Sequence, residues 1–476
     1  MTRAVPPGLA GAATAPSWSA LLVLAAVVAL SRAPFLGGGY GSDMDAWSLA
    51  SAARWIAEHG RYGASRFPGH PVQELTCALL WRGGPWALNG ATAWMSVAAA
   101  VAFARLLGTL GVRNPWLGGL ALSFTPVVFV HSTDSMDFVW SLPFLIAGLE
   151  AAVRGRTVVA GAMVGIATGC RITSAAMLPT VALLLAARTG GERATFRSLA
   201  TVVLAFVVAG AIVLAPMIAR FGASFLSIYE SRFSAGALDV AKNGTIEVWG
   251  LIGTIALTTL AVSLLTSRRH RSPVIPRIEV AAWLVAVVVY VAGFLRLPFD
   301  AGYLMPAVPV ALVLAARLAA PGAFALLCVA LIVSPLTLEV AEVGKPDSPR
   351  PSRIAMTVGI LGRPVVIDPL QGPVAWDQAR RRAQLRYRDR IRAATDAAAA
   401  GGEVLVIADG WTAYLTVDHR TPRPDARFVH SLDAARAAGL RERGVRIFYL
   451  PEAQWNYQAR HGVGLERLGA RPLAGV

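Results

Sequence analysis

Apolar residues gather in long runs over the first 340 residues of the chain, and polar residues divide these runs into helix-sized pieces. The runs predict eleven helices: Trp18–Leu36, Trp86–Leu107, Trp116–His131, Phe138–Val153, Val158–Cys170, Thr173–Ala187, Leu199–Ile218, Val248–Thr266, Val280–Leu295, Gly302–Ala316 and Phe324–Leu338. A helix that crosses a bilayer without tilting needs roughly 20 apolar residues. The runs between Trp116 and Ala187 are shorter, so we expect their helices to lean into a protein-lined or water-filled cavity.

The pattern changes after residue 340. From residue 341 to residue 476 there is no long apolar run, and short apolar stretches alternate with polar ones. Strands are predicted at Arg363–Asp368, Glu403–Gly410 and Val445–Leu450, and helices at Trp376–Ala400 and Leu432–Arg443. Such alternation is typical of a small sheet covered by helices. We therefore predict a polytopic α-helical membrane domain over residues 1–340 and a soluble α/β domain over residues 341–476, connected through the proline-rich segment Gly344–Ser352.

Composition supports a membrane protein. Of the 476 residues, 55% are hydrophobic and 15% are charged, whereas a soluble globular protein carries about 25% charged residues. This difference excludes a soluble enzyme, a disordered chain and a collagen-like chain. The net charge of +16 comes from arginines scattered over the loops, which is typical of membrane topology and anionic-lipid contact rather than nucleic-acid binding. Cys77, Cys170 and Cys328 are far apart and predict neither a disulfide framework nor a zinc site.

The placement of arginine predicts the orientation of the chain. With the N-terminus in the cytoplasm, 13 basic residues fall in short inner loops and ten fall in much longer outer loops. Cytoplasmic loops are enriched in Lys and Arg, and Ser267–Arg277 carries the densest group. We expect a multi-pass protein of the cytoplasmic membrane, with the N-terminus inside and the C-terminal domain on the outer, periplasmic face. The alternative is that Trp18–Leu36 is a cleaved signal peptide, although no clear A-x-A site follows it.

The first outer loop, residues 37–85, holds the most informative polar residues. Glycines between residues 37 and 41 break the helix, and Asp43 and Asp45 follow as a D-x-D pair. Ala46–His59 then predicts an amphipathic helix at the membrane surface. An aspartate in this place could cap that helix by accepting backbone N–H groups, or the pair could act on a substrate. Acidic groups beside a bilayer tend to mark function, and the predicted topology puts most of them on this outer side.

Four segments resemble the membrane glycosyltransferases of the GT-C superfamily, particularly the branch of protein O-mannosyltransferases and lipid A aminoarabinose transferases. They are the acidic pair in Ser42–Trp47, the segment Arg66–Leu75, the acidic loop and small-residue helices of His131–Pro179, and the tyrosine-leucine-proline segment Phe299–Leu314. The likeness covers roughly residues 15–340. The family's threonine-lysine turn corresponds here to Arg171-Ile172-Thr173, and the C-terminal domain lies outside the resemblance.

The resemblance implies a glycosyltransferase. Its members typically take a sugar from a polyprenyl-phosphate carrier and pass it to a glycan, lipid or protein acceptor at the outer face, usually with inversion. An inverting transfer needs one general base beside the acceptor hydroxyl. The family's catalytic acid usually heads the acidic pair, so Asp43 is the first candidate for the base and Asp45 the second. One carboxylate could instead orient the acceptor or bind a divalent metal ion, and the resemblance leaves metal dependence open.

The departing phosphate needs cations nearby. Arginine presents several N–H donors in one plane, and the candidates are Arg61, Arg66, Arg171 and Arg296, each of which could equally contact lipid headgroups. Arg171 is the strongest because it lies between two apolar helices. The remaining candidates for the substrate cavity are His70, Asp134, Asp137 and Tyr303. The two aspartates could contact a sugar, pair with Arg171 or cap a helix; His70 could contact acceptor or metal, and Tyr303 could be an interfacial anchor.

Two other functions fit a polytopic protein. A transporter would place ionisable residues near helix centres and show repeat symmetry, and the sequence shows neither feature. A ligase or polymerase of lipid-linked glycans typically keeps its key residues in a large late outer loop, whereas the acidic pair here follows the first helix. The C-terminal aromatic residues Trp411, Tyr414, Trp455 and Tyr457 could contact carbohydrate or pack in a core, and we favour the core.

Overall fold

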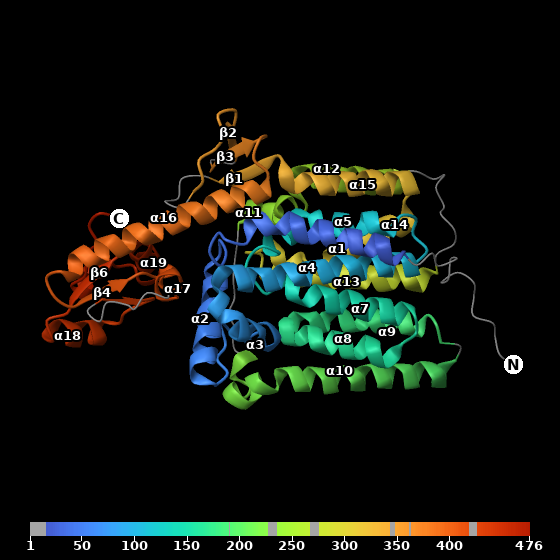
Figure 1. Ribbon diagram of the computed structural model, residues 1–476, viewed down its shortest axis with the longest axis horizontal. Coiled ribbons are helices and arrows are strands. Elements are labelled where there is room, and N and C mark those ends of the chain that lie inside the picture. Colours follow the sequence, from blue (N-terminus) through green and yellow to red (C-terminus); the bar gives the residue numbers. More distant parts are fainter. Residues whose placement is uncertain are drawn as a thin grey trace.

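The computed structural model describes residues 16–189, 191–226, 236–266, 276–342, 348–360, 363–417 and 426–476. Within these ranges the chain forms a bundle of apolar helices, and the C-terminal stretch lies against one end of that bundle (Figure 1). Every apolar run that the sequence pattern indicated contains a helix. These bundle helices are α1 (Trp18–Arg32), α4 (Gly84–Thr109), α5 (Pro115–Phe124), α7 (Leu142–Val153), α8 (Thr157–Cys170), α9 (Leu178–Ala186), α10 (Glu192–Phe221), α12 (Ile246–Thr266), α13 (Arg277–Arg296), α14 (Ala307–Leu318) and α15 (Pro321–Val333).

Five helical stretches of the described chain are long and apolar enough to cross a membrane. They are Trp18–Phe35, Pro71–Thr109, Glu192–Phe221, Ile246–Thr266 and Arg277–Arg296. The prediction of an integral membrane protein is therefore confirmed. The other bundle helices are shorter; α7 has 12 residues and α9 has nine. Eleven membrane crossings accordingly stay a prediction.

The long and short helices differ in what surrounds them. Helix α10 exposes large apolar side chains along its outer face, among them Phe196, Leu204 and Ile212. Exposed apolar surface of this extent suits contact with lipid tails, which are as apolar as leucine. The short α7 is instead buried almost throughout and packs against α4, α8 and α9. The expectation that the short helices lean into a protein-lined interior therefore holds for α7.

Small residues allow α8 and α10 to pack closely. Gly161, Gly165 and Gly169 recur every four residues on α8 and face α10. A Cβ atom added at Gly161 would lie 2.2 Å from the carbonyl oxygen of Val202, and one at Gly165 would lie 2.6 Å from that of Phe206. Helices in lipid associate through such close backbone approach. The glycines are therefore required by packing, which explains the small-residue pattern of this helix.

Several short elements cover one end of the bundle, at the left in Figure 1. Helix α2 (Met44–His59) runs across the bundle axis, and α3 (Pro71–Leu80), α6 (Pro126–His131) and α11 (Ala237–Gly244) lie at the same end. The amphipathic helix predicted over Ala46–His59 is thus confirmed as α2. It ends at Gly60, which closes the last turn in a left-handed backbone conformation (φ 64°). Glycine adopts this conformation readily because it has no side chain.

The C-terminal stretch contains two sheets. β1 (Glu339–Glu342), β3 (Arg363–Asp368) and β2 (Met356–Ile360) form an antiparallel sheet in the order β1-β3-β2. The long helix α16 (Pro373–Ala399) leads to a parallel sheet in the order β5-β4-β6-β7. Its strands are Ala426–Val429, Val404–Ile407, Arg446–Tyr449 and Arg471–Pro472, and the accompanying helices are α17 (Trp411–Thr416), α18 (Ala434–Glu442) and α19 (Pro451–His461). Each strand and helix predicted for this stretch is present. The prediction of a single small sheet is wrong, because Arg363–Asp368 pairs with β1 and β2 and not with the parallel strands.

The C-terminal stretch is closely attached to the bundle. Helix α16 packs against α6, and α17 packs against α2. β1 starts at Glu339, just before the boundary predicted at residue 340. Two separate domains therefore remain a prediction, because the elements of the second part share contacts with the first.

The acidic residues predicted to share one face do gather at one end of the bundle: Asp43, Glu247, Asp300 and residues of α16 line one cavity. This agrees with the sidedness deduced from the sequence. The predicted orientation uses the basic segment Ser267–Arg277, and residues 267–275 of this segment lie outside the described residues. The side of the membrane that this end faces therefore stays a prediction.

We expect that end to face outward. A cysteine introduced at Ala474 should react with a membrane-impermeant thiol reagent added to intact cells, and one introduced at Ser272 should react only after the cells are opened. The native cysteines Cys77, Cys170 and Cys328 are buried, so background labelling should be low. The opposite labelling pattern would contradict both the topology and the extracytoplasmic site.

Candidate active site

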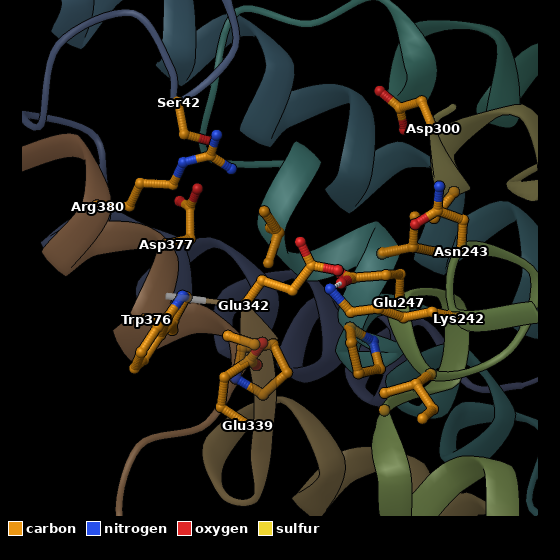
Figure 2. A pocket seen from close by; sticks show the side chains of 18 of the residues that line it. Ser42, Lys242, Asn243, Glu247, Asp300, Glu339, Glu342, Trp376, Asp377 and Arg380 are labelled. Atoms are coloured by element: carbon orange, nitrogen blue, oxygen red, sulfur yellow. Dashed lines mark ion pairs between the residues drawn. The ribbon is translucent and has the colours of Figure 1, made fainter. Parts of the chain in front are cut away.

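A cavity of about 410 Å³ lies where the end of the bundle meets the C-terminal stretch. Figure 2 shows that polar side chains enter it from several parts of the chain. They come from the segment before α2, from α6, α11 and α12, from the turn after α13, and from β1 and α16: Ser42, Asp43, His131, Lys242, Asn243, Glu247, Asp300, Glu339, Glu342, Asp377 and Arg380. A volume of this size is within the range of small-molecule sites.

Asp43 has two roles in this arrangement. Its Oδ1 accepts a hydrogen bond from the backbone N–H of Asp45 at 2.8 Å, so Asp43 is the N-cap of α2. The capping role weighed from the sequence is therefore present. Asp43 is also exposed and lines the cavity. Among the described residues it forms no ion pair, which leaves its carboxylate available to a ligand in the cavity.

Asp45 has different surroundings, although it is only two residues away. Its Oδ2 pairs with Nη1 of Arg66. Burial raises the pKa of Asp45 to about 6, and the nearby carboxylates of Asp43 and Asp137 add to this rise, while Arg66 opposes it. The D-x-D pair thus consists of one carboxylate facing the cavity and one bound to arginine.

Arg66 joins Asp45 to a buried group of charges, which we call the arginine cluster (Asp45, Arg66, His70, Asp137 and Arg171). Asp137 is its centre: Arg66 Nη2 contacts its Oδ1, and Arg171 Nη1 contacts its Oδ2. His70 Nδ1 lies 3.6 Å from the same Oδ2. Burial by itself would raise the pKa of Asp137, but Arg171 and Arg66 hold it well below its usual range. Asp137 is therefore ionised and holds both guanidinium groups.

The aromatic rings of Phe138 and Tyr303 complete the surroundings of Arg171. The guanidinium carbon lies 4.2 Å from the ring centre of Phe138 and 5.1 Å from that of Tyr303. A cation over an aromatic face is stabilised by the ring quadrupole. Tyr303 therefore belongs to the surroundings of Arg171, and its role toward a substrate stays a prediction. The structure also shows that Asp137 takes the pair with Arg171.

Glu74 shapes the loop that carries Arg66 and His70. This fully buried carboxylate accepts hydrogen bonds from the backbone N–H and the hydroxyl of Ser65, each at 2.7 Å, and from the backbone N–H of His70 at 3.0 Å. His70 in turn donates from Nδ1 to the carbonyl oxygen of Cys170 at 2.8 Å. The imidazole is therefore fixed beside Asp137. No sequence pattern indicated this part played by Glu74.

A second group of charges includes two residues that line the cavity, His131 and Asp300. His131 Nδ1 is 3.2 Å from Asp134 Oδ2, and its Nε2 is 3.8 Å from Asp300 Oδ1. Burial raises the pKa of Asp300, and Asp43 adds to this rise, whereas His131 opposes it. Asp134 was predicted as a site residue, but His131 and Asp300 were not. The spacing of His131 and Asp134 by one helical turn was the available signal.

Another pair of charges lines the cavity: Lys242 Nζ pairs with Glu247 Oε1 at 2.9 Å (Figure 2). Glu339 lies close to this pair and is 8% exposed. Burial raises the pKa of Glu339 to about 8; Glu247 contributes to this rise and Lys242 opposes it. These residues were missed at the sequence level because they belong to three separate elements with no shared motif.

Two of the four predicted phosphate ligands lie outside the arginine cluster. Arg61 and Arg296 have exposed side chains, Arg61 in the loop after α2 and Arg296 at the end of α13. The arginine cluster includes neither residue. Their proposed contact with phosphate stays an untested prediction, and lipid headgroups are an equally suitable partner for arginines in such exposed positions.

Asp43 and Asp45 were also candidates for binding a divalent metal ion. Divalent Ca²⁺ and Mg²⁺ prefer several oxygen ligands. Asp45 is already paired with Arg66, and no group of three or more His, Cys, Asp or Glu residues in the described part of the chain could hold a metal ion.

The C-terminal aromatic residues mostly pack inside the protein, as we favoured. The rings of Trp411 and Tyr414 pack at a tilt with centres 4.7 Å apart, and Tyr414 lies equally close to Trp47 of α2. Tyr457 packs against His461. Trp455 is the exception, since 71% of it is exposed.

Comparison with known proteins gives one similarity. No protein-family model matches the chain, and no curated protein matches it. Among solved structures, the fold is similar to the crystal structure of ArnT from Cupriavidus metallidurans bound to undecaprenyl phosphate, with a TM-score of 0.46 and 17% sequence identity. The match covers 63% of this chain and 60% of the ArnT chain, so the present protein spans about three fifths of the length of ArnT.

Proposed function

We propose that the protein is a membrane glycosyltransferase that moves a sugar from a polyprenyl-phosphate carrier to a hydroxyl acceptor, with inversion. One observation carries the proposal: at one end of an apolar bundle, Asp43 lines a cavity without an ion-pair partner in the described chain, and Asp45, two residues further on, is paired with Arg66 of the arginine cluster. A donor with a lipid tail and a sugar phosphate needs this combination. The acceptor is a glycan, a lipid or a protein.

The arginines would bind the donor phosphate. A guanidinium group carries five N–H donors in a fixed plane, and Asp137 uses only part of those on Arg66 and Arg171. The remaining donors suit phosphate oxygens, and the low exposure of Arg171, at 7% of its side chain, strengthens the attraction by excluding water. The same donors would stabilise the negative charge that grows on the phosphate as the sugar leaves.

Asp43 would act as the base. The acceptor hydroxyl gives its proton to the Asp43 carboxylate, and the acceptor oxygen forms a bond to the anomeric carbon of the sugar. The bond between that carbon and the phosphate oxygen breaks, and its electron pair stays on the departing polyprenyl phosphate. Attack from the opposite side inverts the anomeric configuration, so no covalent intermediate with the protein is needed.

Mass spectrometry of lipids and glycans would test the proposed activity. Cells without the gene should accumulate a polyprenyl-phosphate-linked sugar and lose one glycosylated product, and restoring the gene should reverse both changes. A strain that carries the Asp43→Asn variant is the control for effects of protein loss. Identical lipid and glycan profiles with and without the gene would contradict the proposal.

Donor binding should depend more on Arg171 than on Arg66, because Arg171 is the more buried of the two. A charge-assisted contact contributes roughly 1.5–3 kcal/mol, so Arg171→Ala should weaken binding of polyprenyl phosphate about 10- to 150-fold. Equilibrium binding to purified protein measures this effect. Arg82→Ala, at an exposed arginine outside the arginine cluster, is the control.

Arg171→Lys separates binding from folding, since it keeps a positive charge beside Asp137. It should fold normally and bind the donor more weakly than the native protein, because an ammonium group lacks the planar set of donors. If correctly folded Arg171→Ala binds the donor as tightly as the native protein does, Arg171 is not a donor ligand.

A further inference from the structure

The C-terminal stretch contacts the backbone beside Asp43, 342 residues away along the chain. We propose that Gln384 of α16 and Tyr414 of α17 are positioning residues, which hold the Asp43 carboxylate at the right distance from the arginine cluster. This inference rests on the proposed function, and it assigns to the C-terminal stretch a role in the transfer step itself.

Both residues bind the same carbonyl oxygen. Gln384 Nε2 donates to the carbonyl oxygen of Ser42 at 2.9 Å, and the Tyr414 hydroxyl donates to it at 3.1 Å. Ser42 directly precedes Asp43. The two donors therefore fix the peptide group from which the Asp43 side chain departs toward the cavity.

Neighbouring contacts support this attachment. The ring of Tyr414 lies 4.7 Å from that of Trp47, and Trp47 Nε1 donates to the carbonyl oxygen of Gly41 at 2.9 Å. Gln378, also on α16, donates to the carbonyl oxygen of Phe35 at 3.4 Å. The segment that carries Asp43 is thus held at both ends and in the middle by the C-terminal stretch.

The same helix holds the segment that carries Asp137. Arg381, which is fully buried, donates from Nη1 to the carbonyl oxygen of Thr133 at 2.7 Å and from Nη2 to its hydroxyl at 3.1 Å. Its Nε pairs with Asp377 at 2.7 Å, which keeps the guanidinium in place. Arg381 and Gln384 are three residues apart and so lie on one face of α16. One face of α16 therefore contacts both the segment that carries Asp43 and the segment that carries Asp137.

This connection matters because transfer depends on geometry. The base must reach the acceptor hydroxyl while the phosphate rests on the arginines, and a misplacement of about 1 Å can cost roughly 100-fold in rate. A segment of loop backbone has little stiffness of its own. Two donors on one carbonyl, supplied by helices anchored through a buried arginine, restrict it.

The test is the double variant Gln384→Met/Tyr414→Phe. It removes both donors but keeps the side-chain volume and the ring against Trp47. Turnover should fall about 10- to 100-fold, while the affinity for polyprenyl phosphate stays within about twofold of the native value, because the arginine cluster is untouched. The matched control is Gln458→Met/Tyr457→Phe on α19, which makes the same chemical changes away from the site and should leave turnover unchanged.

Combining the double variant with Asp43→Asn tests whether Gln384 and Tyr414 affect turnover through Asp43. If Gln384 and Tyr414 act through Asp43, their loss should lower turnover little further once the base is gone, since coupled residues are not additive. Multiplicative losses would overturn the inference, as would native turnover in the double variant. A parallel loss of turnover and donor affinity would do the same, because it would indicate general disruption.

The base assignment and the positioning role can be tested separately. Full activity of Asp43→Asn would overturn the base assignment and this inference with it. An inactive Asp43→Asn beside a fully active Gln384→Met/Tyr414→Phe would overturn only the inference.

Discussion

Asp43→Asn should lower turnover by roughly 10²–10⁴, the usual contribution of a positioned general base, and should leave folding and donor binding intact. The structure makes this substitution unusually informative. Asp43 caps α2 through its Oδ1, and asparagine caps helices about as well as aspartate does. The variant therefore keeps the structural role and loses only the capacity to accept a proton. Turnover and donor affinity of the purified protein measure the outcome.

Two companion variants sharpen the result. Asp43→Ser also keeps a capping oxygen without a carboxylate, and it should lose activity to the same extent. Asp45→Asn should lose less if Asp45 mainly orients Arg66 and the acceptor. If Asp45→Asn loses more than Asp43→Asn, the roles of the two residues are reversed. If Asp43→Asn remains fully active, Asp43 is a helix cap and not the base.

Asp137→Ala should destabilise the protein by about 3–5 kcal/mol, the usual cost of breaking a buried ion pair by removing one partner. Its carboxylate is 3% exposed and holds both Arg66 and Arg171, so its loss leaves two guanidinium groups without their counter-charge in a buried site. Thermal or denaturant unfolding in detergent or lipid nanodiscs measures the change.

Asp389→Ala is the matched control. Asp389 also pairs with an arginine, Arg388, at 2.9 Å, but its side chain is 63% exposed. Exposed pairs contribute about 0–1 kcal/mol, so this variant should unfold almost like the native protein. Equal effects of the two substitutions would show that the arginine cluster does not stabilise the fold and that Asp137 serves another purpose.

These two predictions distinguish the carboxylate that reacts from the carboxylate that holds the arginines in place. Asp43 faces the cavity and is expendable for the fold as long as a cap remains, whereas Asp137 is enclosed by arginines and fixes where they lie. Loss of turnover with an intact fold at Asp43, and loss of the fold at Asp137, would together support a site in which one carboxylate reacts and another organises cations.

Much of the architecture could be read from the sequence, because the signals for it are local. Runs of apolar residues predict helices wherever they occur, and the helices α1 to α15 in the bundle follow them. Strands such as Arg363–Asp368 agree with the pattern of short apolar stretches. Residue type and sidedness also selected Asp45, Arg66, His70, Asp137, Arg171 and Tyr303, all of which the structure brings to one site.

The number of membrane crossings was harder to read. Hydropathy identifies a helix, but it does not distinguish a short helix enclosed by others from one that faces lipid. Helix α7 is apolar and only 12 residues long, and its burial among α4, α8 and α9 follows from tertiary packing. The same limitation applied to Arg61 and Arg296, which share their residue type with Arg66 and Arg171 but lie on the surface.

The sequence alone determined that this is an apolar helical protein with an acidic pair after its first helix, since both properties depend on residues close together along the chain. Only the tertiary structure decided which charges meet. Asp137 is paired with Arg66 from 71 residues away and with Arg171 from 34 residues away, and Ser42 is held by Gln384 from 342 residues away. The physical reason is that hydropathy and helix propensity act over a few residues. The pairing of charges depends instead on how whole helices pack, and packing brings distant residues to within a few ångströms.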